Sequence, residues 1–98
     1  MYSRFISRKQ FAVTESPDPS WGKPIEELAF YQLRDDDTNQ YGVAIALKRI
    51  GNDEEREYEI AQNITGDPRL IEMIIRLLIN HDVTPSSLRD ILDDIMHT

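Results

Sequence analysis

The sequence contains no cysteine, and this absence excludes disulfide bonds, thiolate metal ligands and a thiol nucleophile. Glycine is also scarce: the four glycines stand singly, so there is no glycine-rich loop of the kind that holds phosphate groups. No apolar run approaches the roughly 20 residues that a helix needs to cross a bilayer. The N-terminus carries basic residues but not the apolar segment of a secretory signal. We therefore expect a cytoplasmic protein without membrane contact.

Positive charge is in short supply. Eleven basic residues stand against eighteen acids, which gives a net charge of -7 and opposes broad contact with nucleic acid or an anionic membrane. The distribution is uneven, because residues 1–13 carry three bases and no acid whereas residues 14–66 carry five bases and twelve acids. With 98 residues, of which 40% are hydrophobic, the chain suits a single folded domain over residues 1–98.

The sequence pattern of the first two thirds of the chain predicts β-structure. We expect residues 1–24 to form an N-terminal arm or an edge strand, because the segment 14–24 holds three of the five prolines and predicts a loop. Residues 25–64 predict a β-meander, in which successive strands joined by short turns pair antiparallel. The stretch 57–64 alternates in polarity and predicts one face with Tyr58, Ile60 and Ile64.

The cleanest alternation lies in the stretch 41–47. One predicted face carries Tyr41, Val43, Ile45 and Leu47, and the other carries Gly42, Ala44 and Ala46. The first set is large and apolar, whereas the second is small and nearly flat. The pattern does not say which of these faces the rest of the chain covers.

Residues 67–97 predict a helical hairpin. Asp67 and Pro68 supply a cap and a favourable first helical residue. Apolar residues fill an arc of roughly 240° on the first helix, so one sheet face alone cannot cover it and it needs a second cover. Thr84 and Pro85 predict the start of the second helix, whose apolar stripe spans about 140°. The whole pattern predicts an α+β fold: an antiparallel meander of three or four strands followed by two C-terminal helices packed on one face.

The helical hairpin has the element order of a DNA-binding helix–turn–helix: a helix, a short turn and a capped second helix with an apolar stripe. A recognition helix must offer hydrogen-bond donors and positive charge to the phosphates. The second helix instead presents Asp90, Asp93 and Asp94 against a single base, Arg89. These carboxylates would repel phosphate, so a plain hairpin that covers a sheet is the favoured interpretation, and a DNA-associated regulator is the alternative.

Two acidic groups have partial metal-ligand spacing. Asp35-x-Asp37-x-Asn39 matches the start of a calcium loop, but Gln40 and Ala46 stand where the sharp-turn glycine and the bidentate glutamate belong, so a solvated turn is expected. Asp93 and His97 lie one helical turn apart, but zinc needs three or four fixed ligands and the end of a helix frays. We predict no metal site.

A minimal hydrolase built from His81 with Ser86 or Ser87 is the second alternative. These serines fall in the first turn of the predicted second helix, where hydroxyls commonly satisfy backbone donors. His81 stands where a side chain caps the carbonyls at the end of a helix. We therefore expect no enzyme activity, no catalytic residues and no cofactor.

Apolar surface is the remaining functional signal. If the helices cover the Val43 face of the sheet, the face with Gly42, Ala44 and Ala46 needs the N-terminal arm, solvent or another protein. The wide arc of the first helix also leaves Ile75 and Ile79 at its edge. Either feature can be part of the core. As a hypothesis, these five residues mark a surface for self-association or for a partner protein.

Several stretches together resemble a family of small proteins of unknown function found mainly in clostridia and their relatives. These are Tyr41-Gly-Val-x-Ile, the acidic strand that ends in Asn63-Ile64-x-x-Asp67, and Val83-Thr-Pro-x-x-Leu88-x-Asp90-Ile91-x-x-Asp94. The resemblance covers about residues 28–97 and leaves out the N-terminal arm. It implies an intracellular bacterial protein, and it brings no catalytic or ligand residues because the family has no assigned function.

These observations favour a non-enzymatic protein-interaction or regulatory module that forms a homodimer or binds a partner protein. The sequence does not predict a small-molecule ligand.

Overall fold

The computed structural model describes residues 2–12, 25–50 and 56–97. In chain order the elements are β1 (Tyr2–Ala12), β2 (Ile25–Asp35), β3 (Gln40–Ile50), β4 (Arg56–Thr65), α1 (Pro68–Asn80), a short 3-10 turn η2 (Pro85–Ser87) and α2 (Leu88–Met96). The predicted proline-rich loop over 14–24 and the turn at 51–55 lie outside the described residues.

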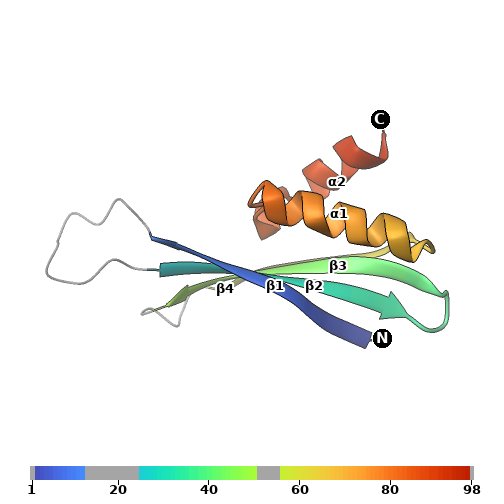
Figure 1. Cartoon of the computed structure of the whole chain (residues 1–98), viewed down its shortest axis with the longest axis horizontal. Coiled ribbons are helices and arrows are strands. Elements are labelled where there is room, and N and C mark those ends of the chain that lie inside the picture. The colour runs from blue at the N-terminus through green and yellow to red at the C-terminus, as the bar shows by residue number, and fades with distance from the viewer. Residues whose placement is uncertain (1, 13–24, 51–55, 98) are drawn as a thin grey trace, which may run out of the picture.

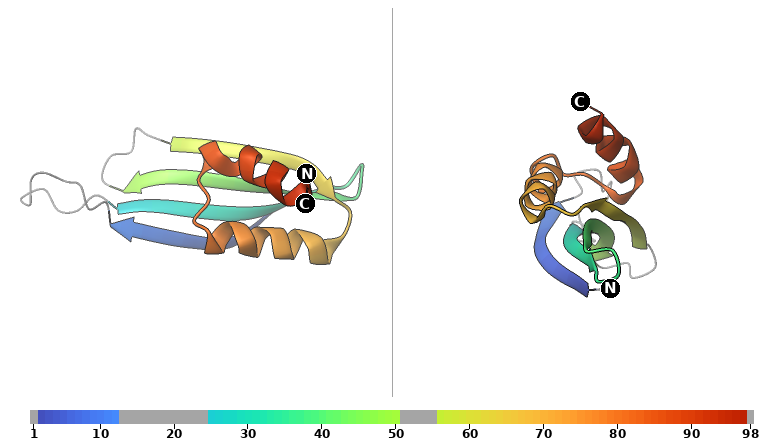
Figure 2. Two further views of the ribbon diagram at one scale, coloured as in Figure 1. Left: turned by 90° about the horizontal axis from the view of Figure 1, so that it is seen from above. Right: turned by 90° about the vertical axis from the view of Figure 1, so that its right-hand side faces the viewer.

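The four strands form one antiparallel sheet in the order β1-β2-β3-β4, and both helices lie on the same side of it (Figure 1). Seen from above, α1 runs along the β1 side of the sheet and α2 along the β4 side (Figure 2). This arrangement confirms the predicted α+β fold with a meander followed by two helices. Of the two predictions for the N-terminal segment, the structure has the edge strand, over Tyr2–Ala12.

The core lies between the sheet and the helices. Phe30 on β2 and Val43 and Ile45 on β3 are fully buried, so the helices cover the face of β3 that carries large side chains. The helical side of the core comes from four residues of α1 and from three that follow it: Ile71, Ile74, Ile75, Leu78, Val83, Leu88 and Leu92. The opposite face of β3, with Gly42, Ala44 and Ala46, therefore points away from the helices.

A bulge in β4 changes which side chains share a face. Tyr41 pairs with Thr65 and Val43 with Ala61, so β4 has two more residues than β3 between these pairs. As a result Ile64 packs against the core with Ala61, whereas Tyr58 pairs with Ala46 on the opposite face. The prediction that Tyr58 and Ile64 share one side is wrong, because strict alternation does not continue through a bulge.

The ends of α1 follow the sequence closely. Asp67 is the N-cap, and its Oδ1 accepts a hydrogen bond of 2.9 Å from the backbone N–H of Arg69. Pro68 occupies the first helical position, as predicted. After the helix, Asp82 adopts a left-handed conformation with φ 51°, which aspartate tolerates better than most residues.

The second helix begins differently from the prediction. Pro85 opens a 3-10 turn rather than an α-helix, and α2 starts only at Leu88. The Thr84 hydroxyl contacts the hydroxyls of Ser86 and Ser87 at 3.2 Å and caps no backbone N–H group. The C-terminal end of α2 then points away from the sheet (Figures 1 and 2). The helix therefore covers α1 only in part.

Candidate interaction surface

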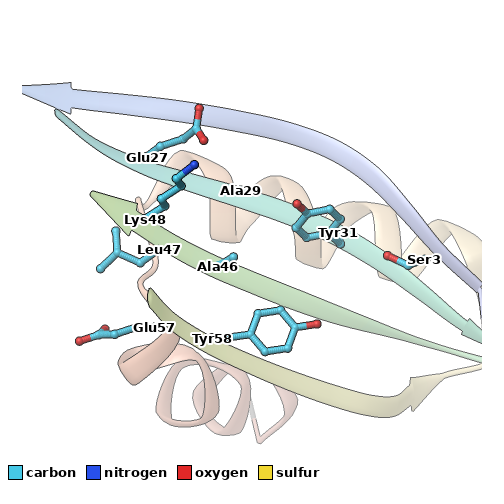
Figure 3. Close-up of a pocket in the computed structure, with 9 residues that line it drawn as sticks. All are labelled: Ser3, Glu27, Ala29, Tyr31, Ala46, Leu47, Lys48, Glu57 and Tyr58. Carbon is cyan, nitrogen blue, oxygen red and sulfur yellow. The ribbon is translucent and has the colours of Figure 1, made fainter. Parts of the chain in front are cut away.

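The sheet face opposite the helices contains a hollow of about 490 Å³, which we call the open-face hollow. Its lining comes from all four strands and consists of Ser3, Glu27, Ala29, Tyr31, Ala46, Leu47, Lys48, Glu57 and Tyr58. Figure 3 shows the alanines on the floor, with Tyr31 on β2 and Tyr58 on β4 on either side of Ala46. The hollow forms because small side chains of β3 on this face leave space between the larger side chains of β2 and β4.

Aromatic side chains provide the exposed apolar area around the open-face hollow. Tyr58 is 58% exposed and Phe5 is 47% exposed. Phe5 and Tyr31 form a cross-strand pair with an edge-to-face geometry and ring centroids 5.7 Å apart. The Arg8 guanidinium lies 5.3 Å from the centre of the Phe5 ring. On the β1 side of the hollow, the Phe5 and Tyr31 rings therefore pack edge to face, with the Arg8 guanidinium beside Phe5.

The charged groups at the open-face hollow balance one another. Two acids, Glu27 and Glu57, line it. Lys48 lines it as well, and Arg8 reaches it through an ion pair with Glu27 at 3.6 Å. These four groups carry no net charge, although the chain as a whole carries -7. The surface around the hollow is therefore nearly neutral in a strongly acidic protein.

The five predicted interaction residues do not form one surface. Gly42 and Ala44 are buried within the sheet, so only Ala46 of the β3 set lines the open-face hollow. Ile75 is 2% exposed in the core and Ile79 is half-buried, and both belong to α1 on the other side of the sheet. The sequence left open whether these two isoleucines belong to the core, and Ile75 does, because α1 turns that residue toward the sheet.

Sequence reasoning missed the aromatic residues of the open-face hollow. Tyr31 belongs to β2 and Tyr58 to β4, and the sequences of these strands alone do not show that both residues share a face with the small side chains of β3. The register with β3 was the missing information. Tyr31 pairs with Ala44 and Tyr58 with Ala46, so the clear alternation of β3 fixes the faces of its neighbours once the pairing is known.

The partial metal-ligand groups have ordinary structural roles. Asp35 ends β2 and Asp37 lies in the following turn, and the Asp35 carboxylate accepts a hydrogen bond from the Asp37 backbone N–H. Asn39 follows with φ 56° and accepts a hydrogen bond from Arg34. Within residues 2–12, 25–50 and 56–97, no three His, Asp or Glu side chains form a group that could hold a metal ion.

The residues of the hydrolase alternative line separate depressions. Exposed His81 borders a groove with Leu77 and Ile91, whereas Ser86 borders another with Glu57 and Glu59. The hydroxyls of Ser86 and Ser87 both contact Thr84. The structure does not bring these three residues together at one site.

The acidic face of α2 is exposed as predicted. Asp90, Asp93 and Asp94 all reach solvent. Arg89 is the basic residue on this helix, and its guanidinium contacts the Glu59 carboxylate at 3.1 Å. A helix with this charge pattern repels phosphate groups.

The architecture defines an α+β domain in which two helices cover one face of a four-stranded antiparallel meander and leave the other face hollowed. Residues 25–98 match the model of a family of unknown function, DUF6514, and the chain belongs to this family. The match begins at the first residue of β2, so β1 lies outside it. No curated protein and no solved structure matches the chain. None of the described helices is both long and apolar enough to span a bilayer.

Proposed function

We propose that this protein is a non-enzymatic interaction module and that its open-face hollow binds a second copy of the chain. The observation that carries the proposal is the composition of this face. The half-buried Tyr31 ring and the exposed Tyr58 ring lie on either side of an alanine floor, and no described element covers this face. Tyrosine and phenylalanine bury much area at little entropic cost and are typical anchors of protein interfaces.

Charge supports a second copy as the occupant. A chain of net charge -7 repels its own copies at most orientations. The open face escapes this repulsion, because Arg8 and Lys48 offset Glu27 and Glu57. A two-fold arrangement also allows a base of one copy to meet an acid of the other, since residues away from the two-fold axis contact different residues of the partner.

The size of the sheet sets the expected strength of the dimer. Four strands spaced about 4.8 Å apart and about ten residues long present a face of roughly 600 Å². Two such faces bury an area at the lower end of specific protein interfaces. We therefore expect a reversible dimer with a micromolar or weaker dissociation constant rather than a permanent one.

Sedimentation equilibrium of the full chain tests this proposal. Over a range from about 1 µM to about 1 mM, the weight-average mass should rise from that of a monomer toward that of a dimer. Ala46→Arg, which places a long charged side chain at the centre of the hollow, should hold the protein monomeric throughout. Tyr58→Ser should weaken dimerisation by about 1–2 kcal/mol, because it removes an exposed aromatic anchor.

Tyr2→Ser is the matched control. Tyr2 is an exposed tyrosine on β1, three residues before Phe5, and strand residues an odd number of positions apart point to opposite faces of the sheet. The Tyr2 side chain therefore faces away from the hollow. It should leave the dissociation constant unchanged within about twofold. A protein that stays monomeric at every concentration would refute the proposal. Equal losses in the Tyr58 and Tyr2 variants would refute the assignment to the open face.

A further inference from the structure

The helical side of the protein carries a second apolar depression, separate from the open-face hollow. It has a volume of about 470 Å³ and is lined by Leu77, His81, Ile91, Asp94 and Ile95. We call it the interhelix groove, because its lining comes from α1, from the residue that follows α1, and from α2. A volume of this size is within the range of ordinary binding pockets.

Two rows of side chains at helical spacing form the interhelix groove. Leu77 and His81 lie four residues apart, as do Ile91 and Ile95, and residues four apart share one face of a helix. Met73 extends the first row by one turn. Met73 is 56% exposed and Leu77 is 38% exposed, although α1 also carries four fully buried residues, Ile71, Ile74, Ile75 and Leu78. The expected second cover of α1 is thus incomplete, because α2 diverges from it.

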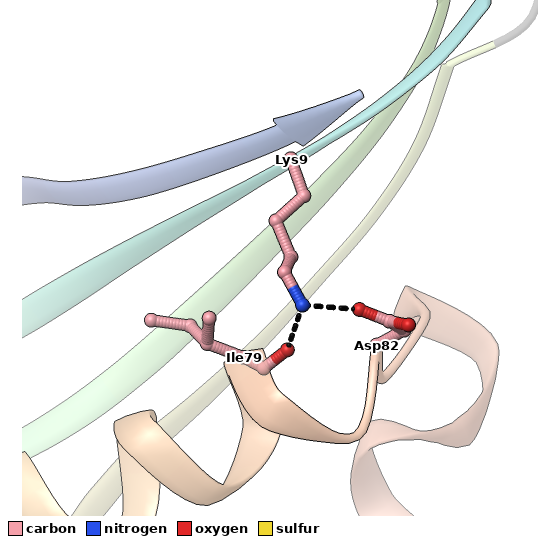
Figure 4. Close-up of polar contacts among 3 residues, drawn as sticks. All are labelled: Lys9, Ile79 and Asp82. Carbon is pink, nitrogen blue, oxygen red and sulfur yellow. Dashed lines mark hydrogen bonds and ion pairs between the residues drawn. The ribbon is translucent and has the colours of Figure 1, made fainter. Parts of the chain in front are cut away.

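Contacts outside the interhelix groove hold its walls in place. The Lys9 ammonium group donates hydrogen bonds to the Ile79 carbonyl at 2.8 Å and to the Asp82 carboxylate at 2.6 Å, so β1 fixes the C-terminal end of α1 (Figure 4). Arg89 ties α2 to Glu59 on β4. The groove is therefore formed before a ligand arrives, which lowers the entropic cost of binding.

The charge around the interhelix groove is negative. Asp94 lines it, and Asp90 and Asp93 are exposed on the same short helix. Arg89, the basic residue of α2, forms an ion pair with Glu59. The nearest base along α1, Arg76, lines a different depression beside β1. A second copy is a poor occupant here, because it would bring its own Asp94 and a net charge of -7 to an acidic rim.

We propose that the interhelix groove binds a basic amphipathic helix of a partner protein. Apolar residues at positions i, i+3, i+4 and i+7 of such a helix would contact Leu77, Ile91 and Ile95, as in other helix-in-groove complexes. Lysine or arginine residues along its flank would lie next to Asp94. This inference does not depend on the dimer, since the groove and the open-face hollow are on opposite sides of the sheet.

Titration of the full chain with model peptides tests the inference. The probe is a leucine–lysine peptide of about 18 residues, long enough to form a helix with one apolar face. Fluorescence anisotropy should show saturable binding that weakens at high salt, because the flanking charges are screened. A scrambled peptide of identical composition and an amphipathic leucine–glutamate peptide should both bind at least tenfold more weakly.

Two variants locate the binding site. Leu77→Gln should weaken binding of the leucine–lysine peptide about fivefold or more, because it removes an apolar contact. Leu77 is exposed, so the position tolerates a polar side chain. Asp94→Lys should weaken it by a similar factor. Glu72→Lys makes the same change in net charge on the β1 side of α1, where Glu72 lines the other depression, and should alter binding less than twofold.

Amide chemical shifts on adding the peptide should change mainly in α1 and α2, and this mapping does not depend on any variant being folded. Equal effects of Asp94→Lys and Glu72→Lys would overturn the inference, because they would mean attraction to net charge alone. Binding of the scrambled peptide as tight as that of the amphipathic one would overturn it too, as would shifts confined to the open face of the sheet.

Discussion

Gly42 is the residue whose identity the fold constrains most directly. It faces the bulge in β4, and a Cβ atom placed on it would come within 2.3 Å of the Ala61 carbonyl oxygen. The obstacle is backbone rather than a flexible side chain, so the bulge would have to move. Glycine at this position lets β4 approach β3 closely enough to turn Ile64 toward the core.

Gly42→Ala should therefore lower the free energy of unfolding by about 2–3 kcal/mol, measured by urea denaturation at one low protein concentration. Gly66→Ala is the matched control, because a Cβ atom there meets only the Asn39 carbonyl oxygen at an ordinary 3.7 Å. It should change the same free energy by less than about 0.5 kcal/mol. Similar values for the two variants would mean that the close approach at Gly42 is not a constraint.

At the scale of elements, the link between β1 and the end of α1 joins the first strand of the chain to the helical layer. Lys9 makes this link through the Ile79 carbonyl and the Asp82 carboxylate. A double-mutant cycle with Lys9→Met and Asp82→Asn isolates the charged contact, since methionine keeps most of the apolar stem and asparagine tolerates the positive φ of residue 82.

Because both side chains are partly exposed, the coupling energy in this cycle should be about 0.5–1 kcal/mol by urea denaturation. Hydrogen exchange at the β1 amides should become faster in Lys9→Met, since a lost contact to α1 lowers the cost of local opening at an edge strand. Strict additivity of the two substitutions, with unchanged exchange in β1, would show that the contact does not hold the strand.

The elements themselves were largely predictable from local patterns. The alternation of β3 and the Asp67–Pro68 start of α1 are local signals, and both appear in the structure as expected. The placement of Tyr58 and Ile64 on opposite faces was not predictable, because the bulge depends on a non-local contact between Gly42 and β4. The 3-10 turn at Pro85 was also missed, because the cap pattern at Thr84 and Pro85 suits either helix type.

The candidate surfaces were less predictable than the fold. Ala46 was among the predicted interaction residues, but the rings beside it come from β2 and β4, and only strand register brings them together. The wide apolar arc of α1 predicted that the helix needs a second cover, but not that this cover would be incomplete. The residues that remain exposed, Met73 and Leu77, depend on how α1 is rotated against the sheet, which its own sequence does not determine.

At the scale of the whole molecule, the sheet separates two apolar surfaces that differ in charge. The open-face hollow is balanced in charge, whereas the interhelix groove is lined by Asp94 on a helix that also exposes Asp90 and Asp93. Dimerisation through the first should vary little with salt, whereas peptide binding at the second should weaken as salt rises. The two activities can therefore be separated by ionic strength on the same protein without any substitution.

If two copies meet through the open face, an isotope-filtered NOE experiment detects the contact between them. In an equimolar mixture of ¹³C-labelled and unlabelled protein at a concentration near 1 mM, cross-peaks should connect the Ala46 methyl group of one copy to the Tyr31 or Tyr58 ring of the other. Intermolecular cross-peaks only to α1 and α2, or a protein that is monomeric at this concentration, would show that the open face does not join two copies.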